Sequence, residues 1–440
     1  MADFSQDIDL SSYHLRLDRV STLARVIGRV REVTGLVVHA TVSGVTVGEI
    51  VSIGGRAGEI PAQVIGFKDD RVVLMPMGDL NGVGPNSPVS PRNQPHAFPC
   101  GPSILGRVLN GLGEPIDGRG PVLEPHWPVE RAAPVALERA RITQPFVTGV
   151  RAIDGLITLG EGQRVGLFAG SGVGKSTLLG QIAREADADV VVIALVGERG
   201  RELRAFIEDT LGSDGLSRAV VVCSTSDEPS LMRRGAALVA TAVAEFFRDQ
   251  GARVLLMLDS ITRFARAQRE IGLAAGEPPV RRGFPPSVFR LLPKLLERAG
   301  NNHIGSITAI YTVLVEADDL NEPIADEVRA ILDGHIILNR SIAELSRWPA
   351  IDITASVSRV MHQITSTEHQ VAADMFRLQL AAFEANRTLI NAGAYKMGAD
   401  PDIDLAIHNF EHIDEFLQQD ILESSHFAFT INSLLDQFGA

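Results

Sequence analysis

The pattern of apolar and polar positions divides the chain into three parts. Up to about residue 95, short apolar runs rich in β-branched residues are broken by glycine, aspartate or lysine. This spacing is typical of short strands that form a small barrel or a sandwich. The expected strands are Arg25–Val30, Val37–Val42, Glu49–Ile53, Pro61–Phe67 and Arg71–Pro76. A connector rich in proline and glycine follows, from about residue 85 to residue 134.

From about residue 145 to 361, apolar runs alternate with helical patterns, which indicates a mainly parallel α/β core. The buried strands are expected at Val190–Val196, Ala219–Cys223, Val254–Leu258 and Ile304–Thr312. Beyond Met361 the periodicity is helical. Apolar residues suit one face of each of two helices: Phe376, Leu380, Phe383 and Ile390 on the first, and Ile403, Ile407, Phe410 and Leu417 on the second. We therefore expect three domains, at residues 1–95, 96–361 and 362–440.

Composition narrows the class of protein. The 440 residues are 45% hydrophobic and 22% charged, an ordinary balance for a globular protein. The formal net charge of −13 argues against broad binding of nucleic acid. Two cysteines, Cys100 and Cys223, cannot form a disulfide framework, so a reducing cytoplasm is expected. The polar start and the lack of an apolar run of about 20 residues favour membrane association through partners only.

The most informative motif is AGSGVGKST, from Ala169 to Thr177. It follows an apolar strand pattern and opens a helical one, as a phosphate-binding loop does. Its glycines let successive N–H groups turn toward phosphate oxygens, and the helix start adds unpaired donors. The lysine is expected near the β- and γ-phosphates and the serine hydroxyl on Mg²⁺. The predicted nucleotide-binding residues are Ala169, Gly170, Ser171, Gly172, Val173, Gly174, Lys175, Ser176 and Thr177. A dinucleotide loop is excluded because its last glycine is replaced by Lys175.

Two carboxylates follow apolar strands downstream of this loop. Asp259 ends the run VLLMLD, where a P-loop protein holds the water shell of Mg²⁺. Glu198 lies in GERGRE, where a carboxylate can orient and polarise an attacking water. The alternative for the GERGRE run is an ordinary charged turn exposed to solvent.

Three further features are weaker. Arg359 ends PAIDITASVSR, and an arginine is suited to a transition-state phosphate because it is planar, forked and always charged. Trp348 offers a face for stacking a base, although a lone aromatic residue more often packs in a core. Residues 276–289, GEPPVRRGFPPSVF, are too rich in proline and glycine for a helix interior and indicate a long loop. This basic loop either faces a pore or polypeptide, or is simply solvated.

The motifs together resemble those of the rotary ATPase superfamily, over roughly residues 20–440. The matching runs are AGSGVGKS, GERGRE, VLLMLD, PAIDITASVS, LGRVLNGLGEPIDGRG and GSITAIYTVLVEADDLNEPIAD. Within the superfamily, VRAIDGLITLGEGQR, FARAQREIGLAAGEPPVRRGFPPSVF and ILDGHIIL resemble the protein-export ATPases of type III secretion injectisomes and flagella. STSDEPSLMRR, VATAVAEFFRDQG and SSHFAFTINSLL look more like the injectisome branch, with the flagellar export ATPase as the alternative. The resemblance implies a P-loop α/β core of the RecA and F1 type, an N-terminal β-barrel and a C-terminal helical domain.

The resemblance also implies roles. Lys175 and Ser176 bind phosphate and Mg²⁺, and Asp259 lies on the Mg²⁺ side. Glu198 is the catalytic carboxylate, with Arg199 beside the γ-phosphate. Arg359 matches an arginine finger that reaches into a neighbour's site, and Trp348 stands where relatives often carry tyrosine against adenine.

Because Lys175, Glu198 and Arg359 occur in one chain, a homohexamer with six equivalent interface sites is the simplest assembly. The resemblance implies hydrolysis of ATP that strips chaperones from export substrates and helps unfold them. The implied partners are a stator-like peripheral protein, a central stalk protein, the inner-membrane export gate and chaperone–substrate complexes. A noncatalytic ring subunit is disfavoured by Glu198. An RNA translocase is disfavoured because the N-terminal segment lacks an aromatic and basic stacking surface.

Overall fold

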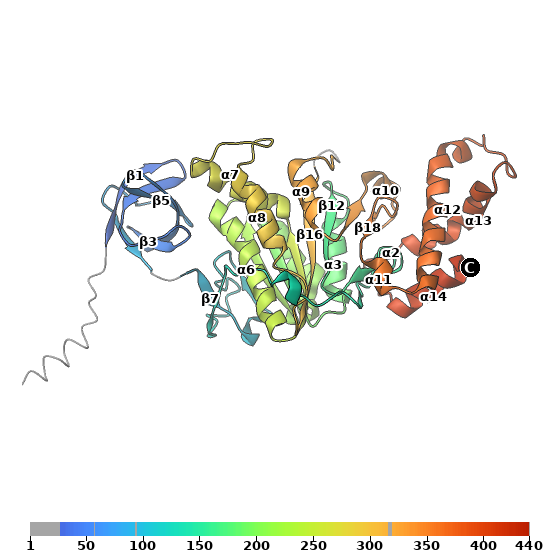
Figure 1. Cartoon of the computed structure of the whole chain (residues 1–440), viewed down its shortest axis with the longest axis horizontal. Coiled ribbons are helices and arrows are strands. Elements are labelled where there is room, and N and C mark those ends of the chain that lie inside the picture. The colour runs from blue at the N-terminus through green and yellow to red at the C-terminus, as the bar shows by residue number, and fades with distance from the viewer. Residues whose placement is uncertain (1–26, 57, 93–94, 316–318, 440) are drawn as a thin grey trace, which may run out of the picture. The chain divides into compact units, whose positions relative to one another are not determined.

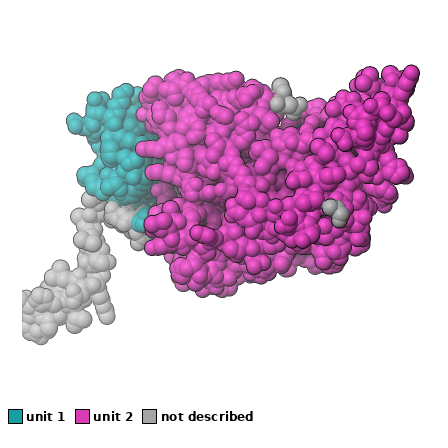
Figure 2. All heavy atoms as spheres, turned by 45° about the vertical axis from the view of Figure 1, so that its right-hand side comes forward, with its two compact units in different colours: residues 1–95 teal, residues 96–440 magenta. Residues whose placement is uncertain are grey.

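The computed structural model describes residues 27–56, 58–92, 95–315 and 319–439. These residues fall into two compact units, divided between Pro95 and His96 (Figure 2). In the described parts of the chain, no helix combines the length and apolarity needed to cross a membrane.

The first unit is a closed barrel (Figure 1). Of the two folds that the strand spacing predicted, a barrel and a sandwich, the barrel is the one observed. Its strand order is β1-β2-β5-β4-β3-β6. The bounds are β1 Gly28–Thr34, β2 Val37–Thr41, β3 Ile50–Gly55, β4 Gly58–Lys68, β5 Arg71–Pro76 and β6 Pro88–Pro91. Alternate side chains fill the interior, among them Val38, Val51, Leu74 and Val89, which are fully buried. Residues 25 and 26 of the first expected strand lie outside the described residues.

Sequence reasoning missed strand β6, which closes the barrel by pairing with both β1 and β3. Its end residues are Pro88 and Pro91, and they made the segment look like part of the connector. A proline cannot donate to a strand ladder, so it is tolerated at strand ends rather than in a strand centre.

The second unit is built on an eight-stranded sheet of order β18-β17-β12-β16-β15-β13-β14-β8. All neighbours pair in parallel except β17 and β18, which are antiparallel. The bounds are β8 Val108–Leu109, β12 Arg164–Ala169, β13 Val190–Glu198, β14 Ala219–Thr225, β15 Arg253–Asp259, β16 Ser306–Leu314, β17 Gly334–Leu338 and β18 Val357–Ser358. The predicted buried strands are therefore present. Three of them are longer than predicted, and the fourth, β16, begins two residues later and ends two residues later than expected.

Helices cover both faces of this sheet, which is why its strands are apolar along their whole length. In β13, Val192 and Ala194 face one hydrophobic core and Val191 and Ile193 face the other. The helices between the strands are α3 Lys175–Glu185, α4 Gly200–Ala205, α5 Gly212–Ser217, α6 Ser230–Asp249, α7 Ile261–Ala274, α8 Pro286–Leu296, α9 Pro323–Ile331 and α10 Arg340–Glu344. Figure 1 shows α6, α7 and α8 side by side along the sheet.

Short elements complete the connections of this unit. They are two-stranded pairs, β7 Ala97–Pro99 with β9 His126–Pro128 and β10 Pro145–Phe146 with β11 Leu159–Gly160, the 3₁₀ turns η1 Pro102–Ile104 and η2 Ala136–Glu138, and the π-helical turn η3 Phe206–Leu211. The expected loop 276–289 is wrong at its end, because Pro286 to Phe289 open α8. Proline is well suited to a first helical turn, where its missing N–H has no partner to lose.

The last helices of the chain are α11 Met361–Ile364, α12 Thr367–Asn391, α13 Pro401–Leu417 and α14 Phe427–Phe438. Helix α2 Arg151–Leu156, from earlier in the sequence, packs against α12, α13 and α14. In α12 the predicted Phe376, Leu380 and Phe383 are buried. In α13 the predicted face is confirmed only in part, because Leu417 is buried whereas Ile403, Ile407 and Phe410 are half-buried. The buried residues are Ala406, Ile413, Phe416 and Leu417, because α13 packs against both α12 and α2 and so buries a different stripe.

Candidate active site

The predicted phosphate loop connects the end of β12 to the start of α3. Gly172 and Gly174 have φ of +78° and +82°, a backbone region that residues with a side chain rarely adopt. The following N–H groups belong to the first turn of α3 and have no partner within the helix. The loop therefore presents backbone donors and the positive end of a helix dipole, a suitable place for phosphate oxygens.

The loop forms one wall of a cleft with a volume of about 1000 Å³. Most of the predicted nucleotide-binding residues line this cleft: Ala169, Gly170, Ser171, Gly172, Gly174, Lys175, Ser176, Thr177 and Trp348. Val173 is the exception, because its side chain is buried in the hydrophobic core beneath the loop. Its contribution to a ligand would come from the backbone.

A cluster of charges lies against the loop lysine. The Nζ of Lys175 contacts the Asp259 carboxylate and lies 3.7 Å from Oε1 of Glu198. On the other side, Nη2 of Arg263 lies 3.1 Å from Oε2 of Glu198. Asp259 is held further by the Thr312 hydroxyl, which donates to Oδ1 at 2.7 Å. The two predicted carboxylates thus meet at the phosphate loop, although Glu198 and Asp259 come from different strands.

The environment of Glu198 perturbs its acidity. Burial raises the pKa of Glu198, and the neighbouring Asp259 carboxylate raises it further. The cations Lys175 and Arg263 act in the opposite direction and lower that pKa. The combined effect is that the pKa of Glu198 is higher than that of an ordinary glutamate. A buried carboxylate with a raised pKa beside a phosphate loop is suited to handle the proton of a water molecule.

The donor set fits a hard divalent cation. Asp259 offers a carboxylate at the end of β15, and Ser176 offers a hydroxyl in the first turn of α3. Among the described residues, no group of three or more His, Cys, Asp and Glu side chains could hold a metal ion by itself. Mg²⁺ suits such a site, because it keeps several waters and takes few protein ligands together with substrate phosphates.

Arginines surround the open side of the cleft. Arg199 is largely exposed and lies 3.5 Å from Glu202, its ion-pair partner one turn along α4. Arg340 donates from Nη2 to the carbonyl of Ser171 in the loop at 3.2 Å. These side chains add positive charge where a triphosphate would extend toward solvent.

Trp348 lies against the phosphate loop rather than in a core. A Cβ placed on Gly174 would come within 2.7 Å of Cζ3 of the Trp348 ring. The ring is 40% exposed and faces the cleft, together with residues 419–421 of the C-terminal helical region. The ring is thus available for stacking, which agrees with the functional alternative considered for this residue.

Arg359 lies apart from the cleft. It directly follows β18, whose Ser358 pairs with Gly334 at the start of β17. The phosphate loop lies beyond the other end of β17, where Leu338 pairs with Ala169. With about 3.3 Å per residue, these two ends of β17 are roughly 13 Å apart. Arg359 is exposed, and its Nη2 lies 3.5 Å from the carbonyl of Arg329.

Sequence reasoning missed several residues of the site. Arg263 could have been found, since it follows Asp259 by one helical turn on α7 and so faces the same edge of the sheet. Thr312 and residues 419–421 gave no signal, because only the tertiary fold brings them to the cleft.

Three family models match the chain. The beta-barrel domain of the ATP synthase alpha/beta family matches residues 30–93 and its nucleotide-binding domain matches residues 149–358. The C-terminal domain of the type III secretion ATPase EscN matches residues 365–436.

Curated relatives match along nearly the whole chain. The type 3 secretion system ATPase of Xanthomonas euvesicatoria is 53% identical over 420 residues, covering 94% of this chain and 95% of the relative. The flagellum-specific ATP synthase of Bacillus subtilis is 49% identical over 399 residues, covering 89% of this chain and 90% of the relative.

Solved structures agree. The assembled ATPase EscN of the enteropathogenic Escherichia coli type III secretion system superposes with a TM-score of 0.89 at 47% identity, covering 94% of this chain and 100% of that one. EscN in complex with its central stalk EscO gives a TM-score of 0.88 at 46% identity, with the same coverage.

Proposed function

Because the chain belongs to the type III secretion ATPases of the ATP synthase alpha/beta family, we propose that it hydrolyses ATP at the interfaces of a homohexamer. The observation that carries this proposal is the separation of two parts of one catalytic apparatus. Lys175 and Glu198 line the cleft and Asp259 lies buried against Lys175, whereas Arg359 is exposed beyond the opposite end of β17. In a ring of identical chains, a head-to-tail interface can bring the arginine of one copy to the cleft of the next.

Within its own cleft, the chain supplies binding and water activation. The loop N–H groups and Lys175 hold the β- and γ-phosphates, so Lys175 exchanges its contact with Asp259 for the nucleotide. Glu198 orients and polarises the water that attacks the γ-phosphorus. Arg263 holds Glu198 in place through the 3.1 Å ion pair and adds positive charge near the γ-phosphate, as does Arg199 from the rim.

The Ser176 hydroxyl and the Asp259 carboxylate would hold Mg²⁺. Such a cation would supply neutralisation of the negative charge on the phosphates. The base of the nucleotide stacks on Trp348, which already covers the loop at Gly174.

Arg359 of the adjacent copy completes the site. Its guanidinium places a fixed positive charge beside the equatorial oxygens of the transferring phosphoryl group, over which negative charge is spread in the transition state. A lone chain lacks this contribution and hydrolyses ATP slowly.

Cyclic opening and closing of the six interfaces then releases chaperones from export substrates and helps unfold them. The solved complex of EscN with its central stalk EscO supports a stalk protein as one partner of this chain. The other proposed partners are a stator-like peripheral protein at the N-terminal region, the export gate and chaperone–substrate complexes. These contacts would hold the ring at the cytoplasmic face of the inner membrane.

A flagellar export role is the second candidate, favoured by the 49% identity to the flagellum-specific enzyme of Bacillus subtilis. Deletion of the gene separates the two. Loss of injectisome secretion with intact swimming supports the injectisome, and loss of swimming assigns the chain to the flagellum.

The interface function is tested by measuring ATPase rate against protein concentration while light scattering reports particle size. The expected result is a specific activity that rises with the hexamer fraction and is lost in Glu198→Gln and Arg359→Ala. Equal specific activity in solutions that contain only monomer would contradict the proposal.

A further inference from the structure

The backbone that carries Arg359 has little regular structure of its own. Strand β18 contains two residues and pairs with β17 alone, at the edge of the sheet. An isolated edge ladder of this length fixes the direction of the following residue poorly. The N–H of Arg359 donates to the carbonyl of Asp333 at 3.0 Å. Whatever fixes Asp333 and Ser358 therefore also fixes where Arg359 points.

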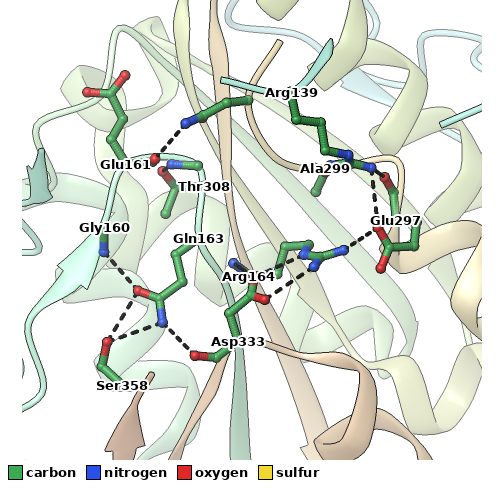
Figure 3. A network of polar contacts seen from close by, with 12 residues as sticks. Arg139, Gly160, Glu161, Gln163, Arg164, Glu297, Ala299, Thr308, Asp333 and Ser358 are labelled. Atoms are coloured by element: carbon green, nitrogen blue, oxygen red, sulfur yellow. Dashed lines mark hydrogen bonds and ion pairs between the residues drawn. The ribbon is translucent and has the colours of Figure 1, made fainter. Parts of the chain in front are cut away.

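A buried amide connects these two residues. Gln163 is inaccessible to solvent, and its Nε2 donates to the carbonyl of Asp333 at 3.0 Å and to the hydroxyl of Ser358 at 3.2 Å (Figure 3). Its Oε1 accepts the N–H of Gly160 at 2.8 Å. Both ends of the amide are thus used, and one of them holds the residue directly before Arg359. A buried polar group with every partner satisfied specifies one arrangement strongly.

The next residue anchors the same carbonyl-bearing segment. Arg164 donates to both carboxylate oxygens of Asp333, from Nε at 3.0 Å and from Nη2 at 3.2 Å. On its other side, Nη1 lies 2.6 Å from Glu297, which also pairs with Arg139 (Figure 3). Such a forked contact adds geometric precision to the position of Asp333.

From this geometry we propose that Gln163 is a positioning residue for the catalytic arginine, holding Ser358 and Asp333 so that Arg359 is presented to the neighbouring copy. This inference rests on the proposed interface function. Gln163 directly precedes β12, the strand that leads to the chain's own phosphate loop. We nevertheless expect it to act mainly on the catalytic site of the neighbouring copy.

The test begins with Gln163→Met, which keeps the length of the side chain and removes its hydrogen bonds. A displacement of about 1 Å at a reacting group can cost about 100-fold in rate, so we expect kcat to fall by about 10- to 100-fold. Binding of a fluorescent ATP analogue should be unchanged, because the cleft lies at the other end of β12. Gln379→Met is the matched control: Gln379 is a buried glutamine of α12 that accepts from Asn409, remote from β18.

Mixed rings decide in which copy the residue acts. Gln163→Met chains are co-assembled in equal amounts with Lys175→Ala chains, which have a dead cleft and an intact Arg359. If Gln163 acts through Arg359, half the clefts are intact and half of their neighbours present the arginine correctly. Random assembly then restores about a quarter of wild-type activity. In the negative control, Glu198→Gln is mixed with Lys175→Ala; both variants damage their own cleft, so every cleft in the mixed rings is defective and the rings stay inactive. The positive control is Arg359→Ala mixed with Lys175→Ala.

Recovery in both the Gln163→Met and the Arg359→Ala mixtures supports the inference. Recovery with Arg359→Ala alone overturns it, because Gln163 then acts on its own cleft. A full rate in Gln163→Met rings also overturns it. Failure of the Arg359→Ala mixture contradicts the proposed function instead. Where Gln163→Met does not fold, Ser358→Ala removes the same link from a half-buried position and is expected to give the same pattern with a smaller loss.

Discussion

The two ends of strand β12 are built in opposite ways. At its carboxyl end the chain opens into glycines with positive φ, and the charges there, Lys175, Glu198 and Asp259, pair with one another beside an open cleft. At its amino end, Gln163 is buried and Arg164 is locked between Asp333 and Glu297.

Under the proposed function, the two ends have different tasks. Groups that bind a triphosphate have to break their contacts with one another when the ligand binds, so these contacts exist only in the empty site. Groups that hold a catalytic arginine for a neighbour have to stay fixed throughout the cycle. One strand thus links a site that exchanges partners to a scaffold that keeps them.

The largest expected effect is at Arg359. Arg359→Ala should lower kcat by about 1,000-fold or more, since an arginine finger contributes roughly 10³- to 10⁵-fold. Nucleotide affinity should change much less, because the arginine is proposed to stabilise mainly the transition state of phosphoryl transfer. Initial rates and equilibrium binding separate the two quantities. Arg359→Lys, which keeps the charge and loses the fork, should recover only part of the rate, and full activity in Arg359→Ala would contradict an interface site.

The next effect is at Glu198. Glu198→Gln keeps the shape of the side chain and should lower kcat by about 100-fold or more, as loss of a positioned general base does. Binding of ATP should persist, which a fluorescent analogue can measure. An active Glu198→Gln enzyme would move water activation to another group. Glu208→Gln, which changes an exposed carboxylate outside the cleft, is the control.

A smaller effect is expected at Trp348. Stacking of a base on an aromatic ring contributes roughly 1–3 kcal/mol, so Trp348→Ala should weaken ATP binding by about 10-fold with kcat at saturation nearly kept. Trp348→Tyr should restore most of the affinity. Unchanged affinity in the alanine variant would leave the base without this contact.

The most subtle effect is on pH dependence. Water activation needs Glu198 ionised, and Arg263 lowers the pKa of Glu198. Removing that cation in Arg263→Gln should raise the pKa of Glu198 further. As the pH is lowered from neutral, the activity of this variant should therefore start to fall at a higher pH than that of the wild type. The pH profile of kcat measures this shift. Arg266→Gln removes a cation from the same helix and cleft and should leave the acid limb in place. If the acid side of the pH profile is the same in Arg263→Gln as in the wild type, a group other than Glu198 controls the loss of activity at low pH.

Sequence predicted the open end of β12 far better than the closed end. The loop from Ala169 to Thr177 is a contiguous motif, and its glycines and lysine together indicate phosphate binding. Gln163 and Arg164 carry no such signal, because a glutamine and an arginine before a strand resemble any polar turn. Their partners are distant in the sequence: Gln163 bonds to Asp333 and Ser358, which lie 170 and 195 residues away.

The fold shows the same division. The parallel strands were predicted because each is apolar along its length. Strand β6 was missed because Pro88 and Pro91 conceal it, and closure of the barrel is a property of six strands together. In α13, Phe410 stacks on Phe383 with ring centroids 3.6 Å apart yet stays half-buried, so its periodicity alone could not identify the buried face.

The proposed function requires that each catalytic site take its phosphate loop from one copy and its arginine from the next. It is tested most directly by co-assembling Lys175→Ala and Arg359→Ala chains, each inactive alone, and measuring the ATPase rate of the mixed rings. About a quarter of wild-type activity should be recovered, because a quarter of the interfaces join an intact loop to an intact arginine. Mixed rings of confirmed size that remain inactive would contradict it.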